Sequence, residues 1–406
     1  MYFLFTIIFL LHSCNKKDSK LVGTPDVKDS KLEIIWKSPI VEDTLIHFAL
    51  GMNPCIYDSL VVFNTDNNYL GKGAPVLFMN KHTGQIVDSW SDYVEGPWTY
   101  RGETTKALGD YLILSSISSI DCLNLKTRQS QWSERFNMVG PYIYLNDGYV
   151  YTGTTFNANT SAAVIRTRPD QNSWDTLYKY TSTDGYKPQF DGINFGEMAN
   201  GDKVLVWKNR SLKWSRDRTE IFAYNLSADT LLWHINYADV VSGAAVLQVD
   251  DMGVYGMIHK KLFALDLQDG SVLWERDFRG LVSDPGSANM DAGIIVQRGD
   301  TLVLKGDTEQ LLYLNKKVGS LLQSTDLAWG NPAHSIETFE GNYYITTTTG
   351  LFIVEAQSGT ILFTNKDDPR FNSRHIKSRV TIDPESRLMY FQNGRHAFCA
   401  KIPEGI

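Results

Sequence analysis

Side chains that commonly do chemistry in proteins are scattered in this sequence of 406 residues. The eight histidines occur singly, and no HExxH, GxSxG or GxxxxGK motif is present. Asn64-x-Asp66-x-Asn68 opens like a calcium loop, because carboxylate and amide oxygens at alternate positions suit Ca²⁺. However, Tyr69 stands where that loop needs a glycine, and Pro75 stands where it needs a bidentate glutamate. The sequence therefore predicts no catalytic group and no metal site.

Three cysteines lie beyond the N-terminal segment: Cys55, Cys122 and Cys399. Their number is odd, and they form neither a CxxC pair nor a zinc-ligand spacing, so no disulfide framework is implied. Each has apolar neighbours in the chain, where a cysteine usually acts as a small buried hydrophobic residue. We expect these thiols to be structural.

The elements of the chain are set by a repeat, seen most clearly in residues 244–278. Four short stretches rich in branched and aromatic residues are separated by Asp, Lys and Gly, which predicts a four-stranded antiparallel meander. Its signature is Ala264-x-Asp266, then Gly270 and Trp274 at intervals of four residues. Copies recur about every 40 residues, which is typical of the blades of a β-propeller. The copies end at Trp90, Trp132, Trp174, Trp233, Trp274, Gln323 and Phe363.

The two ends of the repeat array complete one another. Residues 388–402 supply only two or three strands and no terminal tryptophan, whereas residues 32–37 read as a lone outer strand that carries Trp36. Pairing the N-terminal strand into the last blade gives eight blades and leaves no free seam. We therefore expect an all-β, eight-bladed propeller of four-stranded antiparallel blades, with seven blades as the alternative. The aromatic residues expected to pack between blades are Trp36, Trp90, Trp132, Trp174, Trp233, Trp274 and Phe363.

The remaining tryptophans indicate a candidate binding face. In a four-stranded blade, the connections between strands two and three lie on the same face as those between blades. The long segments 64–74, 91–105, 181–199 and 208–219 are assigned to that face, and functional residues concentrate on such loops. Simple loop packing is the alternative. The candidate binding residues are Trp98, Tyr100, Arg101, Trp214, Arg216, Trp329, His334, Arg374 and His375.

The first residues predict a leader and a membrane anchor. Residues 1–11 form an apolar run that is too short to span a bilayer but suits a secretory signal. The stretch Leu11-His12-Ser13-Cys14 resembles a bacterial lipobox, in which the cysteine is acylated, so we expect a signal peptide over 1–13 with lipid on Cys14. No Lys or Arg precedes the apolar run, which leaves open a start upstream of Met1 and an ordinary signal peptide with an incidental cysteine.

After the cysteine, the chain predicts a spacer and one folded domain. Residues 14–31 are polar and rich in Lys and Asp, and a flexible tether of this length reaches roughly 20–25 Å. The propeller domain then covers 32–406. The formal net charge is −7, so there is no global positive field of the kind that recruits nucleic acid. We expect a location in the cell envelope, on the periplasmic or surface side.

The repeat also resembles a known family. The Ala-x-Asp-x-x-x-Gly-x-x-x-Trp pattern is similar, over about residues 32–402, to the tryptophan-docking repeat of eight-bladed propellers related to pyrroloquinoline quinone (PQQ) dehydrogenases. Length, leader and blade number also resemble the propeller lipoprotein of the outer-membrane β-barrel assembly machinery. Many of the dehydrogenases have inserted segments for PQQ and calcium and a pair of adjacent cysteines, whereas no two cysteines here are adjacent.

The resemblance implies a fold more strongly than it implies an activity. We expect a non-catalytic binding or scaffold protein that presents one face to a protein or peptide partner, or to a glycan that stacks on Trp98 and Trp329. No cofactor is expected. A PQQ-dependent oxidoreductase, with PQQ and calcium, is the alternative.

Overall fold

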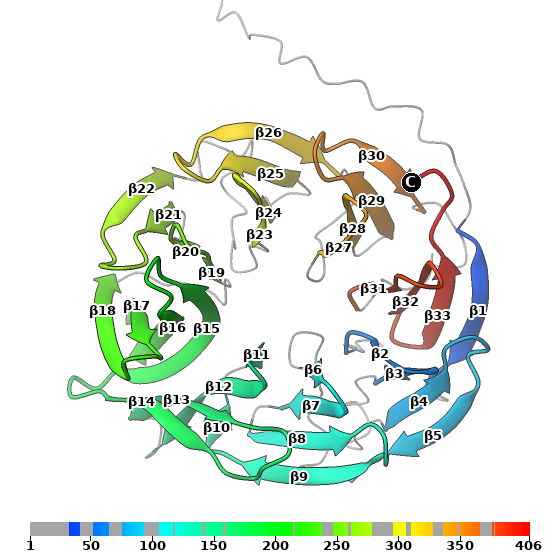
Figure 1. Cartoon of the computed structure of the whole chain (residues 1–406), viewed down its shortest axis with the longest axis horizontal. Coiled ribbons are helices and arrows are strands. Elements are labelled where there is room, and N and C mark those ends of the chain that lie inside the picture. The colour runs from blue at the N-terminus through cyan, green and yellow to red at the C-terminus, as the bar shows by residue number, and fades with distance from the viewer. Residues whose placement is uncertain are drawn as a thin grey trace, which may run out of the picture.

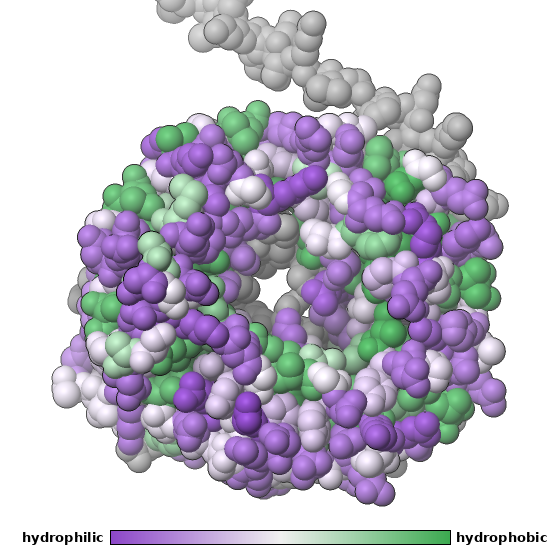
Figure 2. Space-filling view, viewed as in Figure 1, coloured by the Kyte–Doolittle hydropathy of each residue, from purple (hydrophilic) through white to green (hydrophobic). Residues whose placement is uncertain are grey.

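The structure is a computed structural model, in which eight antiparallel sheets stand around a common axis (Figure 1). Figure 2 shows that the ring is hollowed at its centre and that hydrophilic side chains cover most of the face in view. In the described part of the chain, no helix is long and apolar enough to cross a membrane. The described residues are 32–40, 52–64, 75–92, 105–116, 118–139, 143–156, 160–213, 216–237, 247–258, 261–277, 295–305, 310–327, 336–347, 350–365, 376 and 378–406.

Each sheet is one blade, numbered here in chain order from the channel outwards. Blades one to four contain β2 (Cys55–Tyr57), β3 (Leu60–Phe63), β4 (Val76–Asn80) and β5 (Ile86–Trp90); β6 (Thr105–Leu108), β7 (Tyr111–Ser115), β8 (Ser119–Asn124) and β9 (Gln129–Arg135); β11 (Tyr144–Asn146), β12 (Tyr149–Phe156), β13 (Ser161–Thr167) and β14 (Asp175–Thr181), with β10 (Met138–Val139) added to β12; and β15 (Lys187–Glu197), β16 (Lys203–Lys213), β17 (Arg216–Asn225) and β18 (Thr230–Tyr237).

The second half of the ring repeats this order. Blades five to eight contain β19 (Gln248–Val249), β20 (Val254–Ile258), β21 (Lys261–Leu265) and β22 (Val272–Asp277); β23 (Ile295–Arg298), β24 (Thr301–Lys305), β25 (Gln310–Asn315) and β26 (Leu321–Asp326); β27 (Glu337–Phe339), β28 (Asn342–Thr346), β29 (Leu351–Glu355) and β30 (Ile361–Thr364); and β31 (Thr381–Asp383), β32 (Leu388–Gln392), β33 (His396–Lys401) and β1 (Ile34–Pro39).

Burial explains why the two middle strands of a blade read as continuous apolar runs. Every residue of β20 is buried, and so is all of β21 except its first residue. Both faces of these strands contact neighbouring blades, so a run without alternation is favoured. The outer strand β22 buries only Trp274. The core of the ring is therefore a series of layers between blades.

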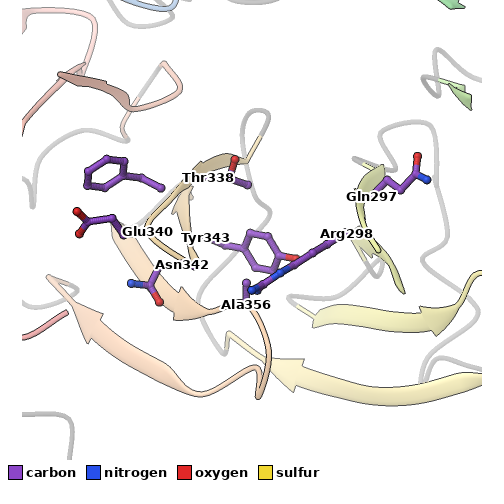
Figure 3. Close-up of a pocket in the computed structure, with 9 residues that line it drawn as sticks. Gln297, Arg298, Thr338, Glu340, Asn342, Tyr343 and Ala356 are labelled. Atoms are coloured by element: carbon purple, nitrogen blue, oxygen red, sulfur yellow. The ribbon is translucent and has the colours of Figure 1, made fainter. Parts of the chain in front are cut away.

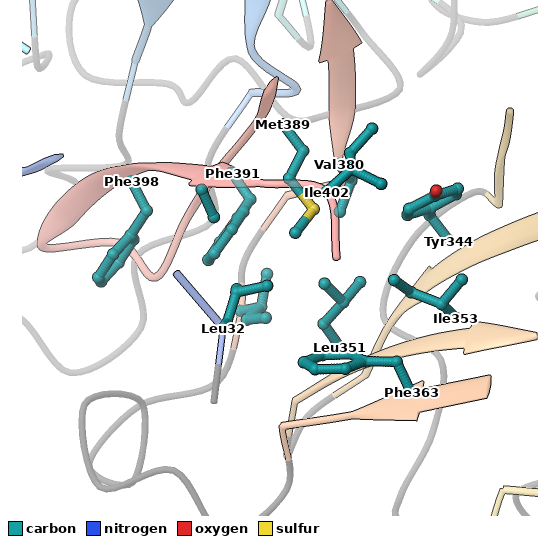
Figure 4. Packing of buried hydrophobic residues seen from close by; sticks show 12 residues of the cluster. Leu32, Tyr344, Leu351, Ile353, Phe363, Val380, Met389, Phe391, Phe398 and Ile402 are labelled. Atoms are coloured by element: carbon teal, nitrogen blue, oxygen red, sulfur yellow. The ribbon is translucent and has the colours of Figure 1, made fainter. Parts of the chain in front are cut away.

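The predicted closure of the ring is confirmed. β1 pairs antiparallel with β33, with Trp36 opposite Cys399 and Ser38 opposite Ala397. Figure 4 shows Leu32, which precedes β1, among apolar side chains of blades seven and eight, including Phe363 and Phe398. The N-terminal strand thus completes both the last sheet and the core beside it.

Tryptophans dock each blade onto the next through a hydrogen bond and a close approach. The indole N–H groups of Trp36, Trp233 and Trp274 donate to backbone carbonyls of the following blade at 2.8–2.9 Å. The rings of Trp36 and Trp274 lie over Gly84 and Gly319, where an added Cβ would come within 2.6 and 2.5 Å of the ring. Both glycines have positive φ, of 69° and 65°. The glycine of the motif is therefore required by backbone conformation and by space.

Other docking residues use related contacts. Trp132 donates to the carbonyl of Pro169 at 2.8 Å, and Trp90 donates to the hydroxyl of Ser130 at 3.0 Å. Phe363 is fully buried but has no N–H to donate. These three residues also occupy layers between blades.

The structure places Trp174 differently from the prediction. In the third blade Val164 lies opposite Tyr178, whereas the equivalent Ala264 lies opposite Trp274 ten residues later. The span from Val164 to its partner is four residues longer than the span from Ala264 to Trp274, so a residue at the motif spacing falls in the turn before the outer strand. Trp174 packs edge-to-face on Trp132 of the preceding blade, with ring centroids 5.7 Å apart.

Two segments predicted as loops are largely strands. Lys187–Glu197 forms β15, the inner strand of blade four, because Phe190 and Ile193 are buried there. The segment 208–219 is also wrong as a loop, since β16 continues to Lys213 and β17 begins at Arg216. The segment is rich in polar and charged residues, so it lacks the apolar pattern from which strands are predicted.

Candidate functional site

The strand order defines two faces of the ring. We call the face with connections between strands two and three, and between blades, the loop face; the turn face carries the two tight hairpins of each blade. The sequence assigned the predicted binding residues to the loop face, and the structure describes only the backbone of one of them. Arg216 begins β17, where its backbone pairs with Lys213. Lying outside the described residues are Cys14, Trp98, Tyr100, Arg101, Trp214, Trp329, His334, Arg374 and His375, and the side chain of Arg216.

Blade four projects beyond its neighbour on the loop face. Its third strand begins seven residues before the docking-level Ala223, whereas β21 begins three residues before the equivalent Ala264. Four extra residues at about 3.3 Å each lengthen the hairpin by roughly 13 Å. We call this projecting part of β16 and β17 the blade-four hairpin. Sequence reasoning took the segment 208–219 for a loop and so missed the strands of this hairpin.

Two cations of the blade-four hairpin contact the ring of Tyr186, the residue before β15. The guanidinium of Arg218 lies 4.3 Å from the centre of the Tyr186 ring, and the Lys213 ammonium lies 5.1 Å from it. Arg218 also donates to the Asp184 carboxylate at 2.7 Å. Hydrogen bonds from Ser182 and Arg218 lower the pKa of Asp184 to about 2. One side of the hairpin is thus a preorganised cation–aromatic surface.

A buried carboxylate supports the base of the same hairpin. Glu220 is 1% exposed, and Asn209 donates to it at 2.6 Å. A ring nitrogen of His234 lies 3.0 Å from its other oxygen. The His234 ring stacks on Phe222 at 4.2 Å between centroids. These contacts fix β16, β17 and β18 against one another where the hairpin leaves the ring.

A hollow of about 290 Å³ opens on the turn face between blades six and seven (Figure 3). It lies beside the end of β23 and the hairpin that joins β27 to β28, and no motif in the sequence predicted it. Figure 3 shows Arg298 and Tyr343 pointing toward one another across it. The lining residues are Gln297, Arg298, Thr338, Phe339, Glu340, Gly341, Asn342, Tyr343 and Ala356.

The cysteines sit away from both features. All three are buried and free, and burial raises the pKa of each thiol to about 12. A thiol with so high a pKa stays protonated at neutral pH and is a poor nucleophile. Within the described ranges, no group of three or more His, Cys, Asp and Glu side chains is placed to hold a metal ion.

Comparison with known proteins adds the likeness of the fold. No protein-family model matches the chain, and no curated protein matches it. Among solved structures, it is similar to BamB from Moraxella catarrhalis, with a TM-score of 0.57 and 10% identity over 91% of this chain and 100% of that one. It is also similar to the quinohemoprotein alcohol dehydrogenase ADHIIG from Pseudomonas putida HK5, with a TM-score of 0.61 and 10% identity over 93% of this chain and 77% of that one.

A third similar structure is Sqt1 from Saccharomyces cerevisiae, with a TM-score of 0.65 and 10% identity over 92% of this chain and 100% of that one. At such identities the likeness concerns the fold alone. By structure, the chain is an eight-bladed β-propeller of the kind seen in BamB and in quinohemoprotein alcohol dehydrogenases.

Proposed function

We propose that this protein is a lipid-anchored binding or scaffold protein of the cell envelope, whose loop face docks a protein partner. The observation that carries the proposal is the blade-four hairpin, which extends roughly 13 Å beyond its neighbour and holds Lys213 and Arg218 against the ring of Tyr186, the residue before β15. Arg and Tyr are favoured at protein interfaces, and a prebuilt surface reduces the entropic cost of binding.

The location in this proposal rests on the sequence. The lipobox-like stretch that ends at Cys14 supports attachment to a membrane, and two or more acyl chains give stable anchoring. The polar tether then holds the ring close to the bilayer. Replacing Cys14 with Ala is expected to move the protein from the membrane fraction to the soluble fraction, which fractionation and immunoblotting would measure.

Site-directed photo-crosslinking tests the docking face. A photoreactive phenylalanine at position 214 is expected to give a discrete protein adduct in membranes. The same probe at Met252, an exposed residue on the turn face, is the matched control and is expected to give none. Equal adducts at both positions, or none at 214, contradict the proposal. An adduct with a glycan would favour the sugar-binding alternative.

The likeness to a quinohemoprotein dehydrogenase defines a second test. PQQ and calcium added to the purified protein are expected to leave its melting temperature unchanged and to give no reduction of an acceptor dye. A raised melting temperature together with dye reduction would favour an oxidoreductase over a scaffold.

A further inference from the structure

Among the described residues, the charges around the turn-face hollow leave one cation without a carboxylate partner. Glu340, the acidic residue of the lining, is held by Arg387, whose Nη1 lies 2.7 and 2.6 Å from its two oxygens. Asp300, in the turn after β23, is held by Lys317 at 2.8 Å. In the described part of the chain, no carboxylate lies within 4 Å of Arg298, which is exposed. The hollow therefore has one positive charge available to a ligand.

The hydroxyl next to that cation lacks an acceptor for its own proton among the described residues. Tyr343 is 1% exposed; the Arg298 side chain lies beside its oxygen as a donor, but no described residue accepts the Tyr343 O–H proton in a well-formed bond. Burial raises the pKa of Tyr343 against the opposing effect of the neighbouring Arg298, so the hydroxyl keeps its proton and can donate. A buried donor left unsatisfied is costly, and a ligand oxygen that accepts from it recovers that cost.

The other polar side chains of the hollow indicate which class of ligand fits it. The amide of Gln297 donates to Asp250, so it is already used. Arg298 and Tyr343, beside the lining amide of Asn342, present donors to an oxygen-rich anion. A single uncompensated cation matches a monoanion, whereas a phosphate monoester carries about −1.5 to −2 charges at pH 7 and would add repulsion with Glu340. An arginine fork suits a planar carboxylate.

We propose that the turn-face hollow between blades six and seven binds the carboxylate of an organic acid or of a peptide C-terminus, through Arg298 and Tyr343. Its volume of about 290 Å³ accommodates a small acid or the last residues of a chain. This site lies on the face opposite the proposed docking face. Failure of carboxylate binding therefore leaves the scaffold proposal standing, and the reverse also holds.

Ligand-observed NMR titration of the purified mature protein tests the proposal, with N-acetylphenylalanine as the acid and its uncharged amide as the matched ligand. The acid is expected to bind with a dissociation constant of roughly 1 mM, and the amide at least tenfold more weakly. A tripeptide ending in a free carboxylate distinguishes a chain terminus, which gains affinity, from a small acid, which does not. Inorganic phosphate at equal ionic strength is expected to bind more weakly than the acid.

Variants connect binding to the named residues. Arg298→Gln is expected to weaken acid binding roughly 10- to 100-fold and Tyr343→Phe roughly 2- to 10-fold. The control is Arg276→Gln, an exposed arginine whose side chain bonds to the carbonyls of Glu275 and Val318, and it is expected to leave binding unchanged. Unfolding midpoints establish that each variant is folded. Equal binding of acid and amide, stronger binding of phosphate, or an Arg298→Gln variant with unchanged affinity overturns the proposal.

Discussion

Two interfaces between blades, one joining consecutive blades and one joining the last blade to the first, contain the same set of aspartate, tryptophan and lysine contacts. Between blades five and six, Trp274 donates to the carbonyl of Lys316, whose ammonium lies 2.6 Å from Asp250. Between blades eight and one, Trp36 donates to the carbonyl of Lys81, whose ammonium lies 3.0 Å from Asp383. We call each set an Asp–Trp–Lys lock. The first joins consecutive blades, and the second closes the ring.

A tyrosine accompanies each lock. Burial raises the pKa of Tyr255 in the internal lock and of Tyr390 in the closing lock, and the nearby aspartates add to this effect. The closing interface has further bonds: Gln392 donates to the carbonyls of Met52 and Asn64 at 2.8 and 2.9 Å. The seam thus has the same lock as an internal interface together with these further hydrogen bonds, so it is not a weak point of the ring.

The largest effect is expected from removing the docking indoles. Trp36→Ala and Trp274→Ala should each lower the free energy of unfolding by about 3–5 kcal/mol, because a large buried ring and its hydrogen bond are lost. Chemical denaturation monitored by circular dichroism measures both. A loss at Trp36 of less than half that at Trp274 would contradict the equivalence of the two interfaces.

Removing the lysine of each lock should have the next largest effect. Lys81→Met and Lys316→Met leave Asp383 and Asp250 without their cation in mostly buried positions, which costs about 3 kcal/mol. The matched control is Lys317→Met, whose pair with Asp300 is exposed and screened by water, so its loss should change stability little. Equal effects of all three substitutions would show that burial does not strengthen the locks.

Replacing the motif glycines should have the third largest effect on stability. Gly84→Ala and Gly319→Ala combine positive φ with a clash against an indole, and each should cost about 2 kcal/mol. Gly109 has φ +58° but no atom within 4 Å of an added Cβ, so Gly109→Ala isolates backbone strain and should cost about 1 kcal/mol. Thermal unfolding of the three variants separates strain from crowding. No difference between Gly109 and the other two contradicts the crowding argument.

The smallest expected effect concerns pH. Burial acts to raise the pKa of Asp383, but hydrogen bonds from Lys81 and Ser386 and the Lys81 charge lower it overall. A lowered pKa in the folded state gives stability that is present above the unfolded pKa of about 3.9 and is lost as pH falls through the folded value. Asp383→Asn should therefore destabilise the protein by about 1 kcal/mol near neutral pH, and by less at about pH 3. A difference independent of pH would contradict this titration.

The sequence predicted those parts of the fold that repeat. Trp233 and Trp274 recur at a fixed spacing because each blade docks in the same way. The strand that carries Trp36 could be assigned to the last blade because the C-terminal residues supply no outer strand there. Trp174 departs from the prediction because an insertion precedes β14, which a spacing rule cannot detect. The turn-face hollow had no local signal, since Arg298 and Tyr343 belong to different blades and meet only through the geometry between them. The loop-face binding residues remain a prediction.

Hydrogen exchange of β1 tests the central claim, that the N-terminal strand closes the ring. Mass spectrometry of the folded protein would compare the amides of β1 with those of β33. The two strands pair from Ile34, opposite Ala400, to Pro39, opposite His396. We expect the β1 amides bonded to β33 to exchange as slowly as the amides of β33, because both open only with the whole ring. Rapid exchange in β1 beside a protected β33 would instead show that the ring is not closed by the N-terminal strand.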